Sequence, residues 1–473
     1  MVKVLDCTLR DGGYYCEWDY ADALVSRYLG AVAKAGVAYA EIGFRSPPSE
    51  GFGGKWKYSR DRSIRAFPAP EGLKLAVMLD AKEFSAGGRL DAEGLEALFA
   101  PRARSPVALV RVATTVKGVA VASEMAALLK RKGYEVAVNL MQASLLGEKE
   151  AIAAAADLES SEADHLYFAD SFGGLSPVET RALFQAARSA FSRSLGFHAH
   201  DNLGLALSNT LAAIEGGADI VDGSVMGMGR GAGNLRTEQL LLYLRHKKGD
   251  ASVDPTALFD VVSVEFEELH RRHQWGVNLA YMLSGVFNVH PTYAQQLLQG
   301  RRASPLEVVR TLQAIASGKG AASFSEAELS RALTRRFAGS AETVAVSTLP
   351  GYREGLPLPR DAATRPFLLL GSGPSVRERA ADVNQLIEAL DPVVVECNLQ
   401  SAIRRATDHY SVFSNQRRIE ECVAQAARGG NPIVLGMQGL SADCHEALRA
   451  APDVRHYGCH VSPGTSTRGR TAA

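Results

Sequence analysis

The sequence lacks the long apolar runs and paired cysteines that mark membrane and secreted proteins. No run reaches the roughly 18 apolar residues that a membrane span needs, and the N-terminal segment MVKVLDCTLRDGG has charges where a signal peptide needs an apolar core. The six cysteines contain no CxxC pair, a usage typical of reduced thiols rather than of a disulfide framework. We expect a cytoplasmic protein that does not associate with a membrane.

Charge of one sign is not in excess either. Lys plus Arg and Asp plus Glu both total 52, so the formal net charge is zero. No segment carries a dominant basic cluster, which argues against a nucleic-acid partner. The 473 residues, of which 46% are hydrophobic, predict about three domains or one large barrel with additions. An enzyme is the expected class.

The first part of the chain, residues 1–245, alternates strand-like and helix-like segments. The eight strand candidates are residues 2–8, 38–44, 73–79, 108–114, 135–141, 165–170, 195–200 and 219–225. Strict alternation over this length predicts an α/β fold, a parallel (β/α)8 TIM barrel. A doubly wound open sheet is the alternative.

The rest of the chain changes character twice. Residues 246–347 read as an appended helical subdomain, with helical segments at 255–274, 293–299 and 305–318. A stretch rich in Pro, Gly and Arg, residues 348–365, predicts a linker. Residues 366–473 then open a small Rossmann-like α/β domain.

Polar residues with metal-ligand chemistry follow three of the strand candidates. Asp11 follows the first, His198 and His200 end the seventh, and Asn234 ends the glycine-rich loop GMGRGAGN after the eighth. Side chains at i and i+2 of a strand share a face, so both imidazoles point the same way. Closure of a barrel brings strands 7, 8 and 1 together at the C-terminal rim, where barrel active sites lie. In an open sheet there is no reason for strand 1 to lie beside strands 7 and 8.

Two imidazoles, a carboxylate and an amide oxygen suit a divalent metal such as Mn²⁺, Mg²⁺, Co²⁺ or Zn²⁺. A 2-oxo acid could fill the open positions, and Arg10 beside the metal would stabilise enolate charge. The alternative is that His198 and His200 have only a structural role, because a His-x-His pair alone on a strand is more often structural than metal-binding.

At these residues the sequence resembles a family of metal-dependent aldolases and lyases. That family includes 4-hydroxy-2-oxovalerate aldolase, 3-hydroxy-3-methylglutaryl-CoA lyase and the isopropylmalate synthases. The resemblance rests on LDCTLRDGG and on the segment FHAHDNLGLALSNTLAAIEGGADIVDGSVMGMGRGAGN, and it covers about residues 1–300. The segments VRVATT (110–115) and YFADSFGGLSP (167–177) most resemble the hydroxy-oxovalerate aldolase branch.

The resemblance implies a role for each matching residue. Asp11, His198 and His200 match metal ligands, Asn234 matches a ligand or a close neighbour of the metal, and Arg10 matches the catalytic arginine. Ser171 matches the residue that holds the substrate carboxylate, although it could instead cap the helix before Pro177. Arg111, in the segment VRVATT, and Glu41 are expected to bind substrate as well.

One position departs from the family pattern. Where the aldolases have a histidine base three residues after the catalytic aspartate, this chain has Tyr14. A tyrosine with a pKa near 10 is a poor base unless its surroundings lower that value. Tyr14 could take the catalytic role, could only shape the pocket, or the base could come from elsewhere.

These features predict an aldolase that needs a divalent metal, Mn²⁺ first, and that acts through the enolate of pyruvate or a related 2-oxo acid. Its partners would be that acid and an aldehyde or ketone, and we expect a homo-oligomer. The alternatives are a Claisen-type synthase that joins an acyl-CoA to a 2-oxo acid, and a retired barrel that serves as a binding scaffold. The lyase acting on 3-hydroxy-3-methylglutaryl-CoA is disfavoured because GMGRGAGN lacks that enzyme's loop cysteine.

The C-terminal segment FLLLGSGPS resembles the opening of a nucleotide-binding unit. Gly371 and Gly373 could let the backbone approach a phosphate, and Glu396, 23 residues after Gly373, lies near the place of a ribose-binding acid. The third glycine of that pattern is missing. A tight strand-to-helix turn is the alternative explanation for these glycines.

Overall fold

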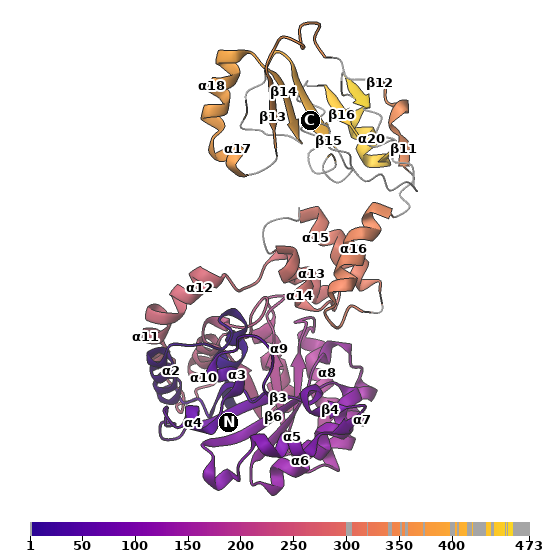
Figure 1. The fold of residues 1–473 in the computed structure, drawn as a ribbon. Helices are drawn as coiled ribbons and strands as arrows, with labels where there is room; N and C mark the ends of the chain where they lie inside the picture. Colours follow the sequence, from indigo (N-terminus) through magenta and orange to yellow (C-terminus); the bar gives the residue numbers. More distant parts are fainter. Residues whose placement is uncertain are drawn as a thin grey trace. The chain divides into compact units, whose positions relative to one another are not determined.

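In the computed structural model the chain divides into two compact units, Met1–Ala332 and Leu333–Ala473 (Figure 1). Each unit is described by itself. The residues that the structure describes are 2–298, 305–318, 320–338, 343–350, 352–354, 358–371, 374–397, 403, 406–413, 419, 432–436, 439–449, 451 and 453–456.

The first unit is built on a closed barrel of eight parallel strands, in the order β1-β10-β9-β8-β7-β6-β3-β2. This confirms the predicted TIM barrel and excludes the open sheet. The strands are β1 (Lys3–Asp6), β2 (Tyr39–Phe44), β3 (Lys74–Asp80), β6 (Val107–Thr114), β7 (Glu135–Leu140), β8 (His165–Asp170), β9 (Ser194–Ala199) and β10 (Ile220–Gly223).

Helices surround this barrel and cover the outer faces of its strands (Figure 1). The longer ones are α2 (Asp22–Lys34), α5 (Ala92–Leu98), α6 (Val119–Arg131), α7 (Glu148–Glu159), α8 (Pro177–Arg188), α9 (Ala206–Gly216) and α10 (Thr237–Lys247). Short elements lie in the loops after β2 and β3, namely α3 (Lys55–Tyr58), α4 (Asp61–Ile64) and the hairpin β4 (Ser85–Ala86) and β5 (Arg89–Leu90). The strands are buried on both faces, as parallel sheets require, with Leu5, Ala76, Leu109 and Tyr167 among the residues that fill the barrel interior.

The carboxylate of Asp6 fixes the turn that carries the first site residues. It accepts hydrogen bonds from the hydroxyls of Thr8, Tyr28 and Thr237, each at 2.5 Å, and from the backbone N–H of Thr8 at 2.9 Å. These bonds end β1 at Asp6 and start the short helix α1 (Thr8–Asp11). The strand is therefore shorter than the predicted segment 2–8.

A helical segment follows the barrel within the first unit. It contains α11 (Phe259–Val261), a π-helical turn (Val262–Phe266), α12 (Glu267–His273), α13 (Leu279–Val286), α14 (Pro291–Leu298), α15 (Pro305–Ala316) and α16 (Glu326–Ala338), the last of which runs into the second unit. Helix α13 packs on the loop after β9, because the side-chain N–H of Asn202 donates to the carbonyl of Tyr281 and to the hydroxyl of Ser284, both at 3.0 Å. The segment therefore covers part of the C-terminal rim of the barrel.

The second unit contains a parallel six-stranded sheet in the order β12-β18-β16-β15-β14-β13. Its strands are β12 (Tyr352–Glu354), β13 (Phe367–Leu370), β14 (Val393–Cys397), β15 (His409–Phe413), β16 (Ile433–Leu435) and β18 (Val454–His456). The described part of this unit also contains the helices α17 (Pro374–Glu378), α18 (Ala380–Leu390) and α20 (Ala442–Leu448) and the antiparallel pair β11 (Thr343–Ala345) and β17 (Gly439–Ser441). Strand β12 lies inside the segment predicted as a linker. Across both units, no helix in the described part of the chain is both long and apolar enough to pass through a bilayer.

Candidate metal centre and active site

Three of the predicted ligands meet at the C-terminal rim of the barrel. Asp11 ends α1, while His198 and His200 lie on and directly after β9. Their ligand atoms all lie within 4.8 Å of one another, and Nε2 of His198 is 3.8 Å from Oδ2 of Asp11. The two imidazole rings lie on one face, with centroids 5.0 Å apart. This is the arrangement that the spacing predicts.

Asn234 completes this group. Its side-chain N–H donates to Oδ2 of Asp11 at 2.6 Å, while its Oδ1 is buried and has no hydrogen-bond partner among the described residues. An unpaired buried carbonyl oxygen is costly, and a bound cation would remove that cost. Two imidazoles, one carboxylate and one amide oxygen form a mixed N/O donor set, which fits a divalent ion.

The protonation of the group also suits a cation. Burial by itself would raise the pKa of Asp11, but the charge of Arg10, with the adjacent imidazoles, holds that pKa well below its ordinary value. Burial, reinforced by nearby positive charges, lowers the pKa of His200 to about 3. Asp11 is therefore anionic and His200 neutral at pH 7, the forms in which both residues bind metals.

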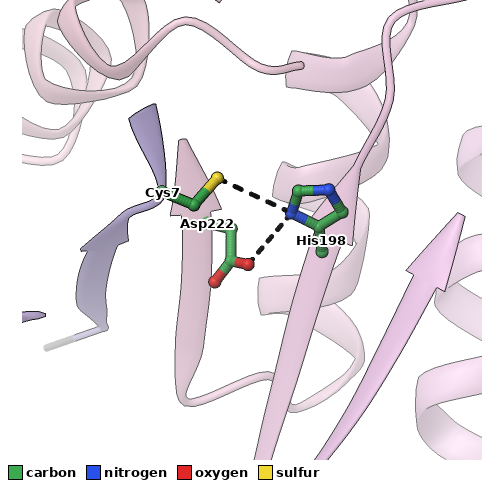
Figure 2. A group of neighbouring side chains, drawn as sticks. All are labelled: Cys7, His198 and Asp222. Carbon is green, nitrogen blue, oxygen red and sulfur yellow. Dashed lines mark hydrogen bonds and ion pairs between the residues drawn. The ribbon is translucent and has the colours of Figure 1, made fainter. Parts of the chain in front are cut away.

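Two residues behind His198 were not predicted from the sequence, and Figure 2 shows them. Oδ2 of Asp222, on β10, lies 3.0 Å from Nδ1 of His198, and Sγ of Cys7 lies 4.0 Å from the same nitrogen. A carboxylate on Nδ1 fixes the imidazole tautomer and leaves Nε2 free to bind a metal. The sequence signal was a charged residue, Asp222, within an otherwise apolar buried strand.

A chain of buried ion pairs joins Arg10 to Asp222. The guanidinium of Arg10 lies 2.6 Å from Oδ1 of Asp11 and 2.7 Å from Oε2 of Glu41. Arg111 lies 3.2 Å from the same Glu41 oxygen and 2.7 Å from Oδ2 of Asp222. Glu41 and Arg111 are fully buried, so they hold Arg10 and Asp222 in place from below. Direct contact of Glu41 and Arg111 with substrate stays a prediction.

Two other predicted residues lie at the ends of their elements. The hydroxyl of Ser171, just after β8, accepts from the backbone N–H of Gln142 at 3.0 Å. The alternative role of Ser171 as a helix cap is wrong, because Ser176 caps α8 in a capping box with Glu179. Contact of Ser171 with the substrate carboxylate is not tested by this geometry.

Tyr14 lies on the rim and remains 44% exposed. Its ring packs edge-on against Trp18 and Phe44, with centroid distances of 4.8 and 6.3 Å. Partial burial among these rings raises the pKa of its phenol above the ordinary value of 10. Tyr14 therefore keeps its proton at neutral pH.

Comparison with known proteins identifies the family. The HMGL-like family model matches residues 98–264. The 4-hydroxy-2-oxovalerate aldolase of Carboxydothermus hydrogenoformans is 31% identical over 308 residues, which cover 64% of this chain and 87% of the relative. The chain belongs to the HMGL-like family.

A second relative and a solved structure agree with this assignment and confirm the family resemblance. An oxaloacetate decarboxylase of Mycobacterium tuberculosis is 33% identical over 258 residues, or 54% of this chain and 74% of the relative. The crystal structure of the N-terminal domain of a candidate aldolase from Bacteroides vulgatus is 34% identical, with a TM-score of 0.59, over 65% of this chain and 99% of that chain.

The second unit lies outside the HMGL-like match. Gly371 is exposed at the end of β13, and Gly373 lies outside the described residues. Glu396, on β14, is buried; it accepts from the hydroxyl of Ser411 at 2.7 Å, and its other oxygen is 3.4 Å from Nε2 of His409. Nucleotide binding by this unit stays a prediction.

Proposed function

We propose that this protein is an aldolase that requires a divalent metal, with Mn²⁺ as the preferred ion. Its substrate would be a 4-hydroxy-2-oxo acid that yields pyruvate, or a related 2-oxo acid, and an aldehyde or ketone. The observation that carries the proposal is the group of Asp11, His198 and His200 with the unpartnered Oδ1 of Asn234, next to the guanidinium of Arg10. A divalent ion held by these four residues would act as a Lewis acid toward the 2-oxo acid.

The chain's own residues suit the remaining steps. In cleavage, the bond between C3 and C4 breaks, the electron pair stays on C3 as an enolate, and the proton of the 4-hydroxyl is removed. The C4 fragment then leaves as the aldehyde, and protonation of C3 gives pyruvate. Arg10, fixed by Asp11 and Glu41, would stabilise the enolate charge.

Tyr14 suits the proton step at the 4-oxygen. In the synthetic direction the aldehyde oxygen gains a proton as the new carbon–carbon bond forms. Because the raised pKa keeps Tyr14 protonated at neutral pH, the phenol is a proton donor in that direction. The phenolate left by this donation would regain a proton from solvent before the next turnover. Cleavage is the reverse step and would start from the minor phenolate form of Tyr14, whose oxygen takes the proton of the 4-hydroxyl.

Exchange of the pyruvate methyl protons in deuterium oxide tests the proposal. Proton NMR with Mn²⁺ should show exchange that EDTA and the variant His200→Ala abolish. No exchange from protein that binds Mn²⁺ tightly would contradict pyruvate as the donor and favour the Claisen-type alternative, in which an acyl-CoA supplies the enolate. No exchange and no bound metal would leave the scaffold alternative.

Decarboxylation of oxaloacetate is a second candidate, favoured by the relative that carries this name. Loss of the C4 carboxylate as carbon dioxide would leave the same pyruvate enolate on C3. Release of carbon dioxide from oxaloacetate at a kcat/KM above that for cleavage of 4-hydroxy-2-oxo acids would favour this candidate.

A further inference from the structure

Arg230 occupies the glycine-rich loop beside the metal ligands. A Cβ at the preceding residue, Gly229, would lie 2.5 Å from Nδ2 of Asn234 and 2.8 Å from Oδ2 of Asp11. The backbone next to Arg230 therefore runs directly against the ligand group. The guanidinium carbon of Arg230 lies 5.8 Å from the ring centroid of Tyr14. The Arg230 side chain thus reaches the rim residue proposed to handle the acceptor oxygen.

Two aromatic rings separate Arg230 from Arg10. Arg10 lies over the ring of Phe44, with its guanidinium carbon 5.9 Å from the centroid. Phe44 packs edge-on against Tyr14 at 6.3 Å, and Tyr14 in turn lies below Arg230. The contacts therefore run from the Arg10 guanidinium through the rings of Phe44 and Tyr14 to the Arg230 guanidinium.

The two cations differ in how their charge is balanced. Arg10 and Arg111 together face three buried carboxylates, those of Asp11, Glu41 and Asp222. A divalent ion added to this group leaves one positive charge, which the carboxylate of one 2-oxo acid neutralises. With the divalent ion and one 2-oxo acid bound, the charges of this group therefore sum to zero.

The charge of Arg230 has no such partner. Among the described residues, no carboxylate forms an ion pair with Arg230, and its Nε is buried without a hydrogen-bond partner. Its NH1 donates to Nε2 of His290 at 3.2 Å, so that nitrogen of His290 must carry a lone pair. Burial, with the charges of Arg230 and Lys82, lowers the pKa of His290 to about 3, and His290 is therefore neutral. An unpaired guanidinium with a buried free N–H is a ready site for a carboxylate or a phosphate.

We propose that Arg230, positioned by His290, binds an anionic group on the acceptor carbonyl compound, so that the physiological acceptor is an aldehyde or ketone that carries a carboxylate or a phosphate. The carbon chain of the acceptor would lie along Tyr14 and Phe44, between the enolate and Arg230. This inference rests on the proposed aldolase function and names its acceptor class.

Matched pairs of acceptors test the inference. Purified full-length protein with Mn²⁺ and ¹³C-labelled pyruvate would be supplied with butyraldehyde or succinic semialdehyde, and with glyceraldehyde or glyceraldehyde 3-phosphate, and NMR would follow the aldol product. We expect the anionic member of at least one pair to have the higher kcat/KM. The pair that shows the preference tells a carboxylate from a phosphate.

The variant Arg230→Gln should lower the anionic-to-neutral ratio of kcat/KM by about ten- to a hundredfold, the usual effect of losing a charged hydrogen bond. Arg230→Lys, which keeps the charge, should recover part of the ratio if the Gln variant folds poorly. Arg236→Gln removes an exposed positive charge near the same loop and should leave the ratio unchanged.

The outcomes separate this inference from the aldolase proposal. If pyruvate exchanges its methyl protons but neither anionic acceptor is preferred, the acceptor inference is wrong and the aldolase proposal stands. An equal fall of the ratio in Arg236→Gln would also overturn it, because the preference would then come from diffuse charge. If pyruvate neither exchanges nor condenses with any acceptor, the aldolase proposal fails, and the inference fails with it.

Discussion

The imidazole of His198 is held between two carboxylates, with Nδ1 3.0 Å from Oδ2 of Asp222 and Nε2 3.8 Å from Oδ2 of Asp11. Asp222 is also bound to Arg111, which reaches through Glu41 to Arg10. The orientation of a candidate metal ligand and the position of the candidate catalytic arginine therefore depend on one buried network. A substitution at either end of that network should therefore alter the position of the residue at the other end.

Asp222→Asn tests the support of His198. The amide could still accept the Nδ1 hydrogen bond, but it removes the charge that raises the basicity of the imidazole and pairs with Arg111. We expect Mn²⁺ affinity to fall about 10- to 100-fold, measured by electron paramagnetic resonance of free Mn²⁺ during titration. The control Asp219→Asn, which removes a partner of Arg188 just before the same strand, should keep the wild-type affinity. An unchanged affinity in Asp222→Asn would contradict the role of that carboxylate.

Asn234→Asp tests cation binding without any assay of activity. The change would place a second carboxylate where an amide N–H now lies 2.6 Å from Oδ2 of Asp11, and like charges at this distance repel. We expect Tm to fall by several degrees in EDTA and to recover when Mn²⁺ is added, as followed by differential scanning fluorimetry. Asn209→Asp removes another buried hydrogen bond, which the side-chain amide of Asn209 donates to the carbonyl of Leu175. This variant should have a lower Tm that Mn²⁺ does not restore. Failure of Mn²⁺ to rescue Asn234→Asp would argue against a cation at this position.

Tyr14→Phe tests the proton donor. With a pKa raised above 10, Tyr14 donates at neutral pH, and the condensation rate should fall only when the pH rises through that pKa. We expect kcat for condensation to fall about 100-fold in the variant and its alkaline decline to disappear from the pH–rate profile. Tyr15→Phe, which loses a weak bond to the carbonyl of Gly231, is the neighbouring control. An equal loss in both variants would contradict a specific role for Tyr14.

Glu135→Gln tests a cluster at the opposite end of the barrel. The Glu135 carboxylate lies 2.7 Å from the hydroxyl of Tyr39, 2.8 Å from Nε2 of His165 and 3.1 Å from Nζ of Lys74. Burial would raise the pKa of Glu135, but these partners lower it to about 2. Because the unfolded-state pKa is about 4.3, the carboxylate stabilises the fold above that pH, and the contribution is lost as the pH falls toward 2.

We expect Glu135→Gln to lower the free energy of unfolding at pH 7 by about 2 kcal/mol and to reduce the loss of stability on acidification. Urea denaturation at several pH values between 7 and 3 measures both effects. Glu124→Gln, at an exposed position on α6, should change neither. A variant with wild-type stability at pH 7 would show that the partners of Glu135 contribute nothing net.

Much of the barrel and its candidate metal group could be predicted because the patterns are local. Alternation of apolar strands with helices fixed the eight-stranded barrel, and the i, i+2 spacing of His198 and His200 placed both imidazoles on one face. The position of Asn234 near the two histidines could also be predicted, because the loops that follow parallel strands of a barrel all lie at the same rim. The ends of some elements were not predicted, because they depend on local hydrogen bonds that the sequence pattern does not show. For example, Asp6 accepts hydrogen bonds from Thr8, and β1 ends earlier than predicted.

The sequence by itself determined the barrel, the rim at which the polar residues gather, and the family to which the chain belongs. Only the tertiary structure decided which other side chains contact and support these polar residues. Cys7 and Asp222 meet His198 because strands β1, β10 and β9 are adjacent in the closed barrel. Arg230 meets His290 because the segment around α13 folds back over the rim. Contacts between residues so far apart in the chain depend on packing and burial, which no local pattern records.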